Sequence, residues 1–127
     1  MSYYKVARTS DVPGGNGLTV RLGRDEIGVF RLGAEYLAIS NLCPHRGAPL
    51  SEGYLEQERV FCPWHCFDFH LRTGESTIAP HLCVTTYPVK VDGDEIFILY
   101  PDELIDWQND WPAGDQKEIE DDVTDDL

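Results

Sequence analysis

Short apolar runs separated by turn residues make up the first hundred residues of the chain. Helical periodicity is almost absent there, and the runs are rich in β-branched and aromatic residues, so they predict strands rather than helices. Turn residues at Gly33-Ala34 and at Asp92-Gly93-Asp94 predict hairpins. The pattern therefore predicts an all-β, antiparallel sandwich or small barrel. We expect strands near Tyr3–Ala7, Leu18–Leu22, Ile27–Leu32, Tyr36–Ile39, Val60–Phe61, Phe67–Leu71, Val84–Val91 and Glu95–Tyr100.

Acidic residues dominate the charge and gather at the C-terminal end. The 127 residues include 10 Lys and Arg against 23 Asp and Glu, a formal net charge of −13. A pI near 4.4 argues against binding to nucleic acid or to an anionic membrane, because both carry negative charge. Lys117 is the single base in residues 102–127. We therefore expect one domain over residues 1–101 and an acidic C-terminal tail over residues 102–127.

Two interpretations of the tail remain open. Leu104, Trp107 and Trp111 are spaced to share one face of a helix, which either docks on the body or contacts a partner. From Asp115 onward the high charge and low apolarity favour disorder.

The N-terminus and the hydropathy indicate the compartment. The first residues lack the apolar run of a secretory signal, and no stretch is long and apolar enough for a membrane-spanning helix. We therefore expect a cytoplasmic protein. In a reducing compartment the four cysteines are more plausible as metal ligands or thiols than as disulfides.

Two stretches interrupt the strand pattern, and each combines Cys, Pro and His. Cys43 and His45 are one residue apart, Cys62 and His65 are two residues apart, and sixteen residues separate His45 from Cys62. The neighbouring prolines stiffen these loops, while Gly47 and Gly53 permit turns that direct the side chains inward.

Two thiolates and two imidazoles suit two kinds of metal centre. They fit a tetrahedral zinc ion, and they fit a two-iron cluster in which one iron takes both cysteines and the other takes both histidines. Zinc fingers usually pair like ligands and place their histidines on a helix, whereas here each loop pairs unlike ligands and no helix is predicted. The spacing therefore favours the cluster, with a structural zinc module that binds a partner as the alternative.

The chain resembles soluble Rieske [2Fe–2S] proteins over about residues 3–100, in particular Rieske-type ferredoxins and the small subunit of NAD(P)H-dependent nitrite reductase. The resemblance implies an antiparallel β-sandwich with a small cluster-binding subdomain inserted at about residues 41–75. It also implies cluster ligation by Cys43, His45, Cys62 and His65, with both histidines at an exposed tip, and a third loop over the cluster at Ile78-Ala79-Pro80. The motifs that carry it are NLCPHRGAPLSEG at Asn41–Gly53, FCPWHCFDF at Phe61–Phe69, RTGE at Arg72–Glu75 and TYPVKV at Thr86–Val91.

The neighbours of the ligands imply a low reduction potential. High-potential members of the family join the two loops by a disulfide, and the matching positions here hold Ala48 and Trp64. Those members also place Ser and Tyr where this chain has Phe67 and Phe69, so hydroxyl donors to the sulfurs are missing. We therefore expect a midpoint potential around −150 mV, at the low end of the Rieske range.

The remaining histidines lack ligand spacing, and Cys66 directly follows His65, so a spare ligand is the alternative for its thiol. Cys66 and Cys83 are expected to be small buried apolar residues, and His70 and His81 to be surface or hydrogen-bonded side chains.

The resemblance implies an electron-transfer component without a catalytic site of its own, exchanging electrons with redox partner proteins. As a nitrite reductase small subunit it would join a large sirohaem–flavin subunit, and as a ferredoxin it would shuttle between a reductase and a ring-hydroxylating oxygenase. The motifs CPHRGAPLSEG and TYPVKV slightly favour the nitrite reductase setting.

Overall fold

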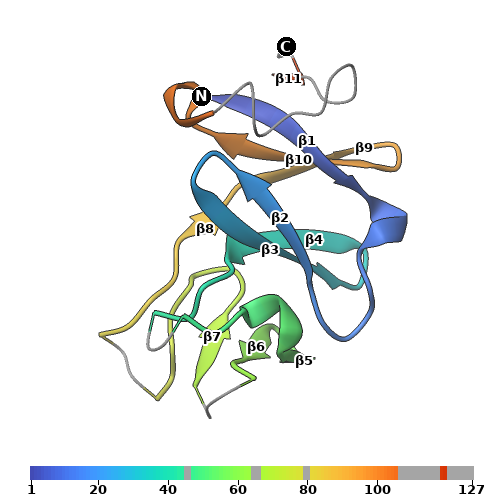
Figure 1. The fold of residues 1–127 in the computed structure, drawn as a ribbon. Helices are drawn as coiled ribbons and strands as arrows, with labels where there is room; N and C mark the ends of the chain where they lie inside the picture. The colour runs from blue at the N-terminus through green and yellow to red at the C-terminus, as the bar shows by residue number, and fades with distance from the viewer. Residues whose placement is uncertain (45–46, 64–66, 79–80, 106–117, 120–127) are drawn as a thin grey trace.

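Antiparallel strands are the main secondary structure of the protein, as a computed structural model shows (Figure 1). The structure describes residues 1–44, 47–63, 67–78, 81–105 and 118–119. Within these residues the strands form two four-stranded sheets and one three-stranded sheet, joined by loops and short 3-10 helices. The all-β class predicted from the pattern of short apolar runs is therefore confirmed.

The first four-stranded sheet has the order β11-β1-β10-β9. Its long strands, β1 (Ser2–Arg8) and β10 (Glu95–Tyr100), pair antiparallel. The strand β9 (Val89–Asp92) forms a hairpin with β10, and Gly93 begins the turn with a φ of +65°. The strand β11 (Glu118–Ile119), from the acidic tail, pairs with the other edge of β1.

The second four-stranded sheet has the order β2-β3-β4-β8. Its hairpins join β2 (Leu18–Leu22), β3 (Asp25–Leu32) and β4 (Glu35–Ser40), and the β3–β4 turn lies at Gly33-Ala34 as the sequence predicted. The run expected as one strand from Val84 to Val91 is divided at Pro88. The strand β8 (Thr86–Tyr87) pairs with β4, and β9 pairs with β10. Proline has no N–H for the ladder, so the chain changes sheets there.

The strands β3 and β4 contribute to two separate hydrophobic cores. Ile27, Val29 and Ala38 belong to the core between the two four-stranded sheets. Phe30 and Ile39, of opposite parity along their strands, belong to a second core on the other side. Because alternate side chains of a strand point to opposite faces, the sheet β2-β3-β4-β8 is covered on both faces.

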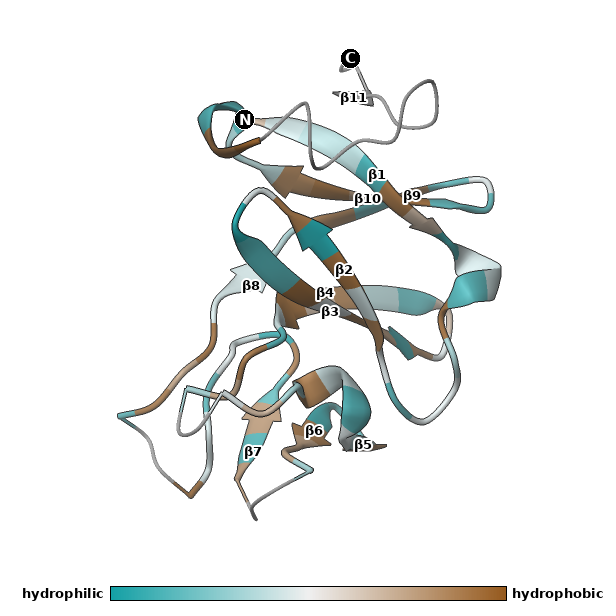
Figure 2. Ribbon diagram, in the orientation of Figure 1, coloured by the Kyte–Doolittle hydropathy of each residue, from teal (hydrophilic) through white to brown (hydrophobic). Residues whose placement is uncertain are grey.

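The second core lies between this sheet and an insertion between β4 and β8. The insertion contains a three-stranded antiparallel sheet of β5 (Tyr54–Glu56), β6 (Arg59–Phe61) and β7 (Asp68–His70), preceded by a 3-10 helix at Leu50–Glu52. It lies at the end of the molecule opposite the first sheet (Figure 1). Figure 2 shows hydrophobic residues on β6 and on the loops around it. A sandwich with a small inserted subdomain is the architecture that the family resemblance implied.

The beginning of the acidic tail packs on the body. A 3-10 helix covers Asp102–Leu104, and Ile105 belongs to the core between the two four-stranded sheets. Asp102 accepts a hydrogen bond from the hydroxyl of Tyr4. Trp107 and Trp111, on which the expected tail helix depends, lie outside the described residues.

Candidate metal centre

The loop that carries Cys43 closes on itself through backbone hydrogen bonds. The N–H of Cys43 donates to the carbonyl oxygen of Ala48 at 2.9 Å, and the N–H of Gly47 donates to that of Cys43 at 2.6 Å. Gly47 has a φ of +77°, a conformation that glycine adopts without strain. The turn expected at Gly47 is therefore present, and these two bonds bring Gly47 and Ala48 back to Cys43.

The loop that carries Cys62 is closed in the same way. The N–H of Cys62 donates to the carbonyl oxygen of Phe67 at 2.8 Å, where the chain enters β7. Gly53 is needed beside this loop because of a close backbone contact, and not because of the turn expected there. A Cβ atom at Gly53 would lie 1.9 Å from the carbonyl oxygen of Phe61, so only glycine lets the backbone approach this closely.

Cys43 and Cys62 lie in one hydrophobic core. Their exposed fractions are 2% and 3%, and both belong to the cluster built around Phe30, Val60 and Phe69. An ionised thiolate in apolar surroundings is unfavourable without a neutralising partner. Ferric iron bridged by sulfide provides that partner, so the pair suits the cysteine half of a Rieske cluster.

The other two expected ligands, His45 and His65, lie outside the described residues, as do Trp64 and Cys66. The described residues contain no group of three or more His, Cys, Asp and Glu side chains suited to a metal ion.

Asn41 anchors the first loop to the sandwich, a role that the sequence did not indicate. Its side-chain oxygen accepts the N–H of Ser51 at 2.6 Å, and its carbonyl oxygen accepts the N–H of Leu50 at 2.7 Å. Its own N–H donates to the carbonyl oxygen of Glu26 on β3 at 2.8 Å. Asn41 is fully buried, so these bonds satisfy polar groups that water does not reach.

Asp68, at the start of β7, is a second buried polar residue that the sequence analysis did not single out. Its carboxylate lies 2.7 Å from the guanidinium of Arg59 and accepts the backbone N–H of Thr77 at 3.1 Å. Burial alone would raise the pKa of Asp68, but the hydrogen bonds from Thr77 and Arg59 outweigh it and lower that pKa below its ordinary value.

The expectation for His70 is confirmed, because its ring is both partly exposed and hydrogen-bonded. Nδ1 accepts the N–H of Arg72 at 3.1 Å, and Nε2 lies 3.2 Å from the carboxylate of Glu58. Arg72 also forms an ion pair with Glu35 at the start of β4, and the guanidinium lowers the pKa of that carboxyl. This exposed network connects the inserted subdomain to the second four-stranded sheet.

The expectation for Cys83 is wrong. Cys83 is exposed, whereas its neighbour Val84 is buried in the core that holds Cys43 and Cys62. An isolated backbone bridge between Glu75 and Cys83 places the residue at the opening of a loop, where its side chain faces solvent. His81 is exposed, as expected.

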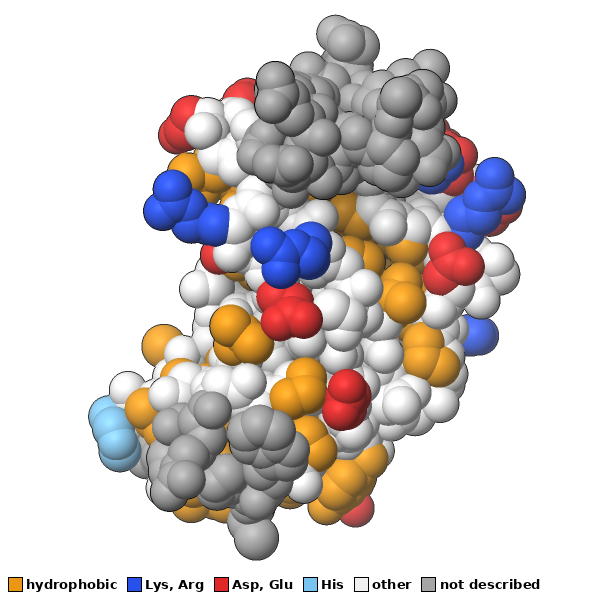
Figure 3. Space-filling model, viewed as in Figure 1, with side chains coloured by type: hydrophobic (Ala, Val, Ile, Leu, Met, Phe, Trp, Pro, Cys, Tyr) orange, Lys and Arg blue, Asp and Glu red, His pale blue; other side chains and the backbone are white. Residues whose placement is uncertain are grey.

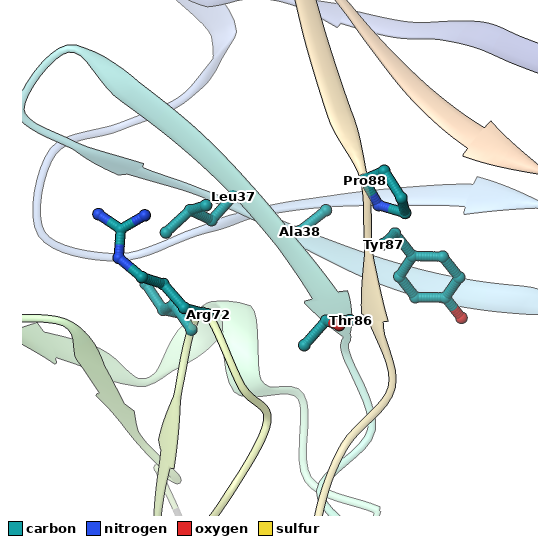
Figure 4. A pocket seen from close by; sticks show the side chains of 7 residues that line it. Leu37, Ala38, Arg72, Thr86, Tyr87 and Pro88 are labelled. Carbon is teal, nitrogen blue, oxygen red and sulfur yellow. The ribbon is translucent and has the colours of Figure 1, made fainter.

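A pocket of about 380 Å³ opens beside the inserted subdomain rather than at the cysteines (Figure 4). Arg72 stands at one side of it, and Tyr87 and Pro88 stand at the other (Figure 4). Leu37, Ala38, Leu71, Arg72, Thr86, Tyr87 and Pro88 line the pocket.

Comparison with known proteins identifies the family. The sequence model of the Rieske [2Fe-2S] domain matches residues 2–88. The ferredoxin subunit of 3-phenylpropionate/cinnamic acid dioxygenase from Shigella boydii is 42% identical over 95 residues, which cover 73% of this chain and 89% of that protein. The chain belongs to the Rieske [2Fe-2S] family.

Solved structures agree with this assignment. The structure of reduced oxygenase with oxidised ferredoxin in carbazole 1,9a-dioxygenase contains a chain with 31% identity and a TM-score of 0.67, and the match covers 75% of this chain and 99% of that one. A structure described as an NADH-dependent nitrite reductase small subunit from Mycobacterium tuberculosis gives 25% identity and a TM-score of 0.70, with 77% and 95% covered.

The fold, the buried cysteine pair and these relatives define a Rieske-type electron-transfer protein that binds a [2Fe–2S] cluster. Related ferredoxins work with oxygenase or reductase partners, as the carbazole 1,9a-dioxygenase complex illustrates. In the described part of the chain, no helix has the length and apolarity needed to cross a membrane.

Proposed function

We propose that Cys43, His45, Cys62 and His65 hold the cluster, and that about residues 41–75 form the cluster-binding subdomain of a domain over residues 1–101. The observation that carries this proposal is the burial of Cys43 and Cys62 in one core, each in a loop closed by its own backbone. Each histidine follows its cysteine within three positions, so both imidazoles belong to the same two loops.

We further propose that the chain is the ferredoxin component of an oxygenase system, which accepts an electron from a reductase and passes it to the oxygenase. The 42% identity to a dioxygenase ferredoxin subunit, across 89% of that protein, supports this setting. When bound, the cluster supplies reversible one-electron transfer.

Apolar side chains are exposed beside the two cysteine loops. Leu42, next to Cys43, is 47% exposed, and Ile78, on the loop before β8, is 54% exposed. Figure 3 shows hydrophobic side chains around the lower end of the molecule, whereas the described Lys and Arg side chains on this face lie farther up. Such side chains favour docking through apolar contact beside the cysteine loops.

Spectroscopy with ligand variants tests the metal centre. The purified protein is expected to contain two irons and two acid-labile sulfides per chain, to absorb visible light and to show an EPR signal when reduced. Cys43→Ser and His65→Ala should abolish these signals, while the control Cys83→Ser should keep them because Cys83 is exposed. A colourless protein with one zinc would instead establish the zinc module.

Affinity purification from the source organism tests the partner. A ferredoxin should elute without a large subunit, and NADH should reduce it in the presence of the matching flavin reductase. The second candidate, a nitrite reductase small subunit, is favoured by the likeness to the M. tuberculosis structure. Co-elution with a large sirohaem-containing subunit would overturn the oxygenase setting and establish this candidate.

A further inference from the structure

The structure describes residues 76–78 and 81–83 of the loop before β8, called here the 76–83 loop, and the far end of this loop is fixed on the turn that follows β7. At its far end, the N–H of Val84 donates to the carbonyl oxygen of Gly74 at 2.9 Å, and Cys83 forms a backbone bridge with Glu75. Leu82 packs against the core that contains Cys43 and Cys62. The loop runs to the same end of the molecule as the two cysteine loops (Figure 1).

Gly74 makes the attachment at the far end possible. Its φ is +81°, and a Cβ atom there would lie 2.2 Å from the carbonyl oxygen of Val84. A larger residue would both strain the backbone and separate it from Val84.

Asp68 fixes the near end of the 76–83 loop. The hydroxyl oxygen of Thr77 lies 2.8 Å from both carboxylate oxygens, and the backbone N–H of Thr77 donates to one of them at 3.1 Å. The hydroxyl of Ser76 donates to the same oxygen at 3.4 Å, and it also accepts the N–H of Ile78. One carboxylate therefore holds the first residues of the loop.

Asp68 also stands directly after the second cysteine loop. Its neighbour Phe67 accepts the N–H of Cys62, which closes that loop. Asp68 is only 2% exposed, and a buried carboxylate remains charged only if it is paired and hydrogen-bonded. Arg59 on β6 supplies the positive charge, at 2.7 Å. The position of the 76–83 loop is thus coupled to that of the Cys62 loop.

We propose that Asp68 is a positioning residue, which holds the 76–83 loop against the cysteine core through Thr77 and thereby limits the access of water to the cluster. This inference rests on the proposed ligation by Cys43 and Cys62. Asp68 itself contacts the loop and Arg59, and it acts on the cluster only through the loop.

Two near-isosteric variants break the contact from opposite sides. Asp68→Asn keeps the size of the side chain but loses the negative charge that faces Arg59. Thr77→Val keeps the size of the side chain and the net charge of the protein but loses the hydroxyl. Thr77→Ser keeps a hydroxyl at this position. Glu35→Gln is the matched control, because it removes one negative charge from an ion pair with Arg72 that does not involve the loop.

The readouts are the rate of cluster loss to a chelator, the midpoint potential and the EPR spectrum of the reduced protein. Asp68→Asn and Thr77→Val should each lose the cluster about 10- to 100-fold faster than the parent protein, with a changed potential and altered g-values. Thr77→Ser and Glu35→Gln should match the parent protein in all three measurements.

A role confined to folding gives a different result. Asp68→Asn and Thr77→Val would then unfold at a lower temperature, while the folded fraction kept the parent's potential and EPR spectrum, and this outcome would overturn the inference. If the parent protein itself lacks the cluster signals, the proposed ligand set fails instead, so the two failures are distinguishable.

Discussion

The backbone N–H of Cys62 donates to the carbonyl oxygen of Phe67, which joins the two ends of the segment that carries the proposed ligands Cys62 and His65 in the sequence. Phe67 is half-buried against the core that contains Cys62, and its side chain has no hydroxyl to donate to a sulfur. Such a donor would favour the reduced cluster, which carries one more negative charge. We therefore predict a midpoint near −150 mV by redox titration, and a value above roughly +100 mV would contradict it.

Phe67→Ser should raise this midpoint. One added hydrogen bond of about 0.5–1.5 kcal/mol corresponds to about 20–60 mV for a one-electron couple. Phe67→Ala removes the ring without adding a hydroxyl, so it is the control. Equal midpoints for the two variants would show that the hydroxyl does not reach a sulfur.

Asn41→Ala should destabilise the fold by about 1–3 kcal/mol, because the buried N–H of Ser51 would lose its acceptor. Chemical denaturation followed by circular dichroism measures the change. Thr19→Val is the comparison, because it removes a 3.3 Å bond from the Asn41 amide and a 2.6 Å bond with the Ser51 hydroxyl but leaves the backbone N–H of Ser51 paired with Asn41. If Asn41→Ala cost no more than Thr19→Val, the anchoring role of Asn41 would be wrong.

The stability of the sandwich should fall at alkaline pH because of Tyr87. Burial, and then the charge of Asp25, raise the pKa of Tyr87 from its ordinary 10.0 to about 12. A raised pKa means that the folded state holds the proton more tightly, so its contribution is present below pH 10 and is lost as the pH rises towards 12. The difference in unfolding midpoint between Tyr87→Phe and the parent protein should therefore change over this interval and be constant below it.

Cys83 should react with a thiol reagent in the folded protein, while Cys43 and Cys62 should not. Cys83 is exposed and the other two are buried. The measurement is made in a Cys66→Ser background, so that only these three thiols are counted. No reaction in the native state would contradict the exposed position of Cys83.

A truncation after Ile105 should leave the fold and the cluster intact. It keeps Asp102, which accepts from Tyr4, and Ile105, which belongs to the sandwich core. It removes β11, so the backbone amides at the edge of β1 should exchange faster with deuterium. Loss of the acidic residues should also weaken association with a redox partner or change its salt dependence. If neither exchange nor association changed, the tail would have no role on the body.

Leu42→Asp should slow electron transfer to a redox partner more than Val91→Asp. The two residues are similarly exposed, at 47% and 41%, but Leu42 adjoins Cys43, and Val91 lies on β9 in the first sheet. Stopped-flow reduction measures the rate. Equal effects would argue against docking beside the cysteine loops.

Repetition along the chain explains which parts of the fold the sequence predicted. Strands such as β3 and β10 repeat their apolar positions over six residues or more, so the hydrophobic pattern locates them. The strand β5 has three residues, and only Leu55 packs against the core, so the strand shows no repeat of apolar positions in the sequence. Pro88 lies inside the run Val84–Val91 that was expected as one strand, and the sequence pattern alone did not indicate that the chain changes sheets there.

Single residues were harder to predict than spaced pairs. Cys43 and Cys62 carried a signal because each has a histidine at a fixed distance. Cys83 has no such neighbour, and its exposure depends on the bridge to Glu75, a contact made only in the folded chain. Asp68 and Thr77 are nine residues apart and are ordinary surface types, so only the structure brings them together.

The sheet β2-β3-β4-β8 forms a wall common to both cores, with Val29 facing one and Phe30 the other. The inserted subdomain therefore has no complete hydrophobic interior of its own. As a separate peptide, it would expose to water the apolar side chains that pack against Phe30 in the whole protein. We therefore expect that such a peptide would not stay folded. Bleaching and melting of the intact protein should accordingly occur as one cooperative event on heating.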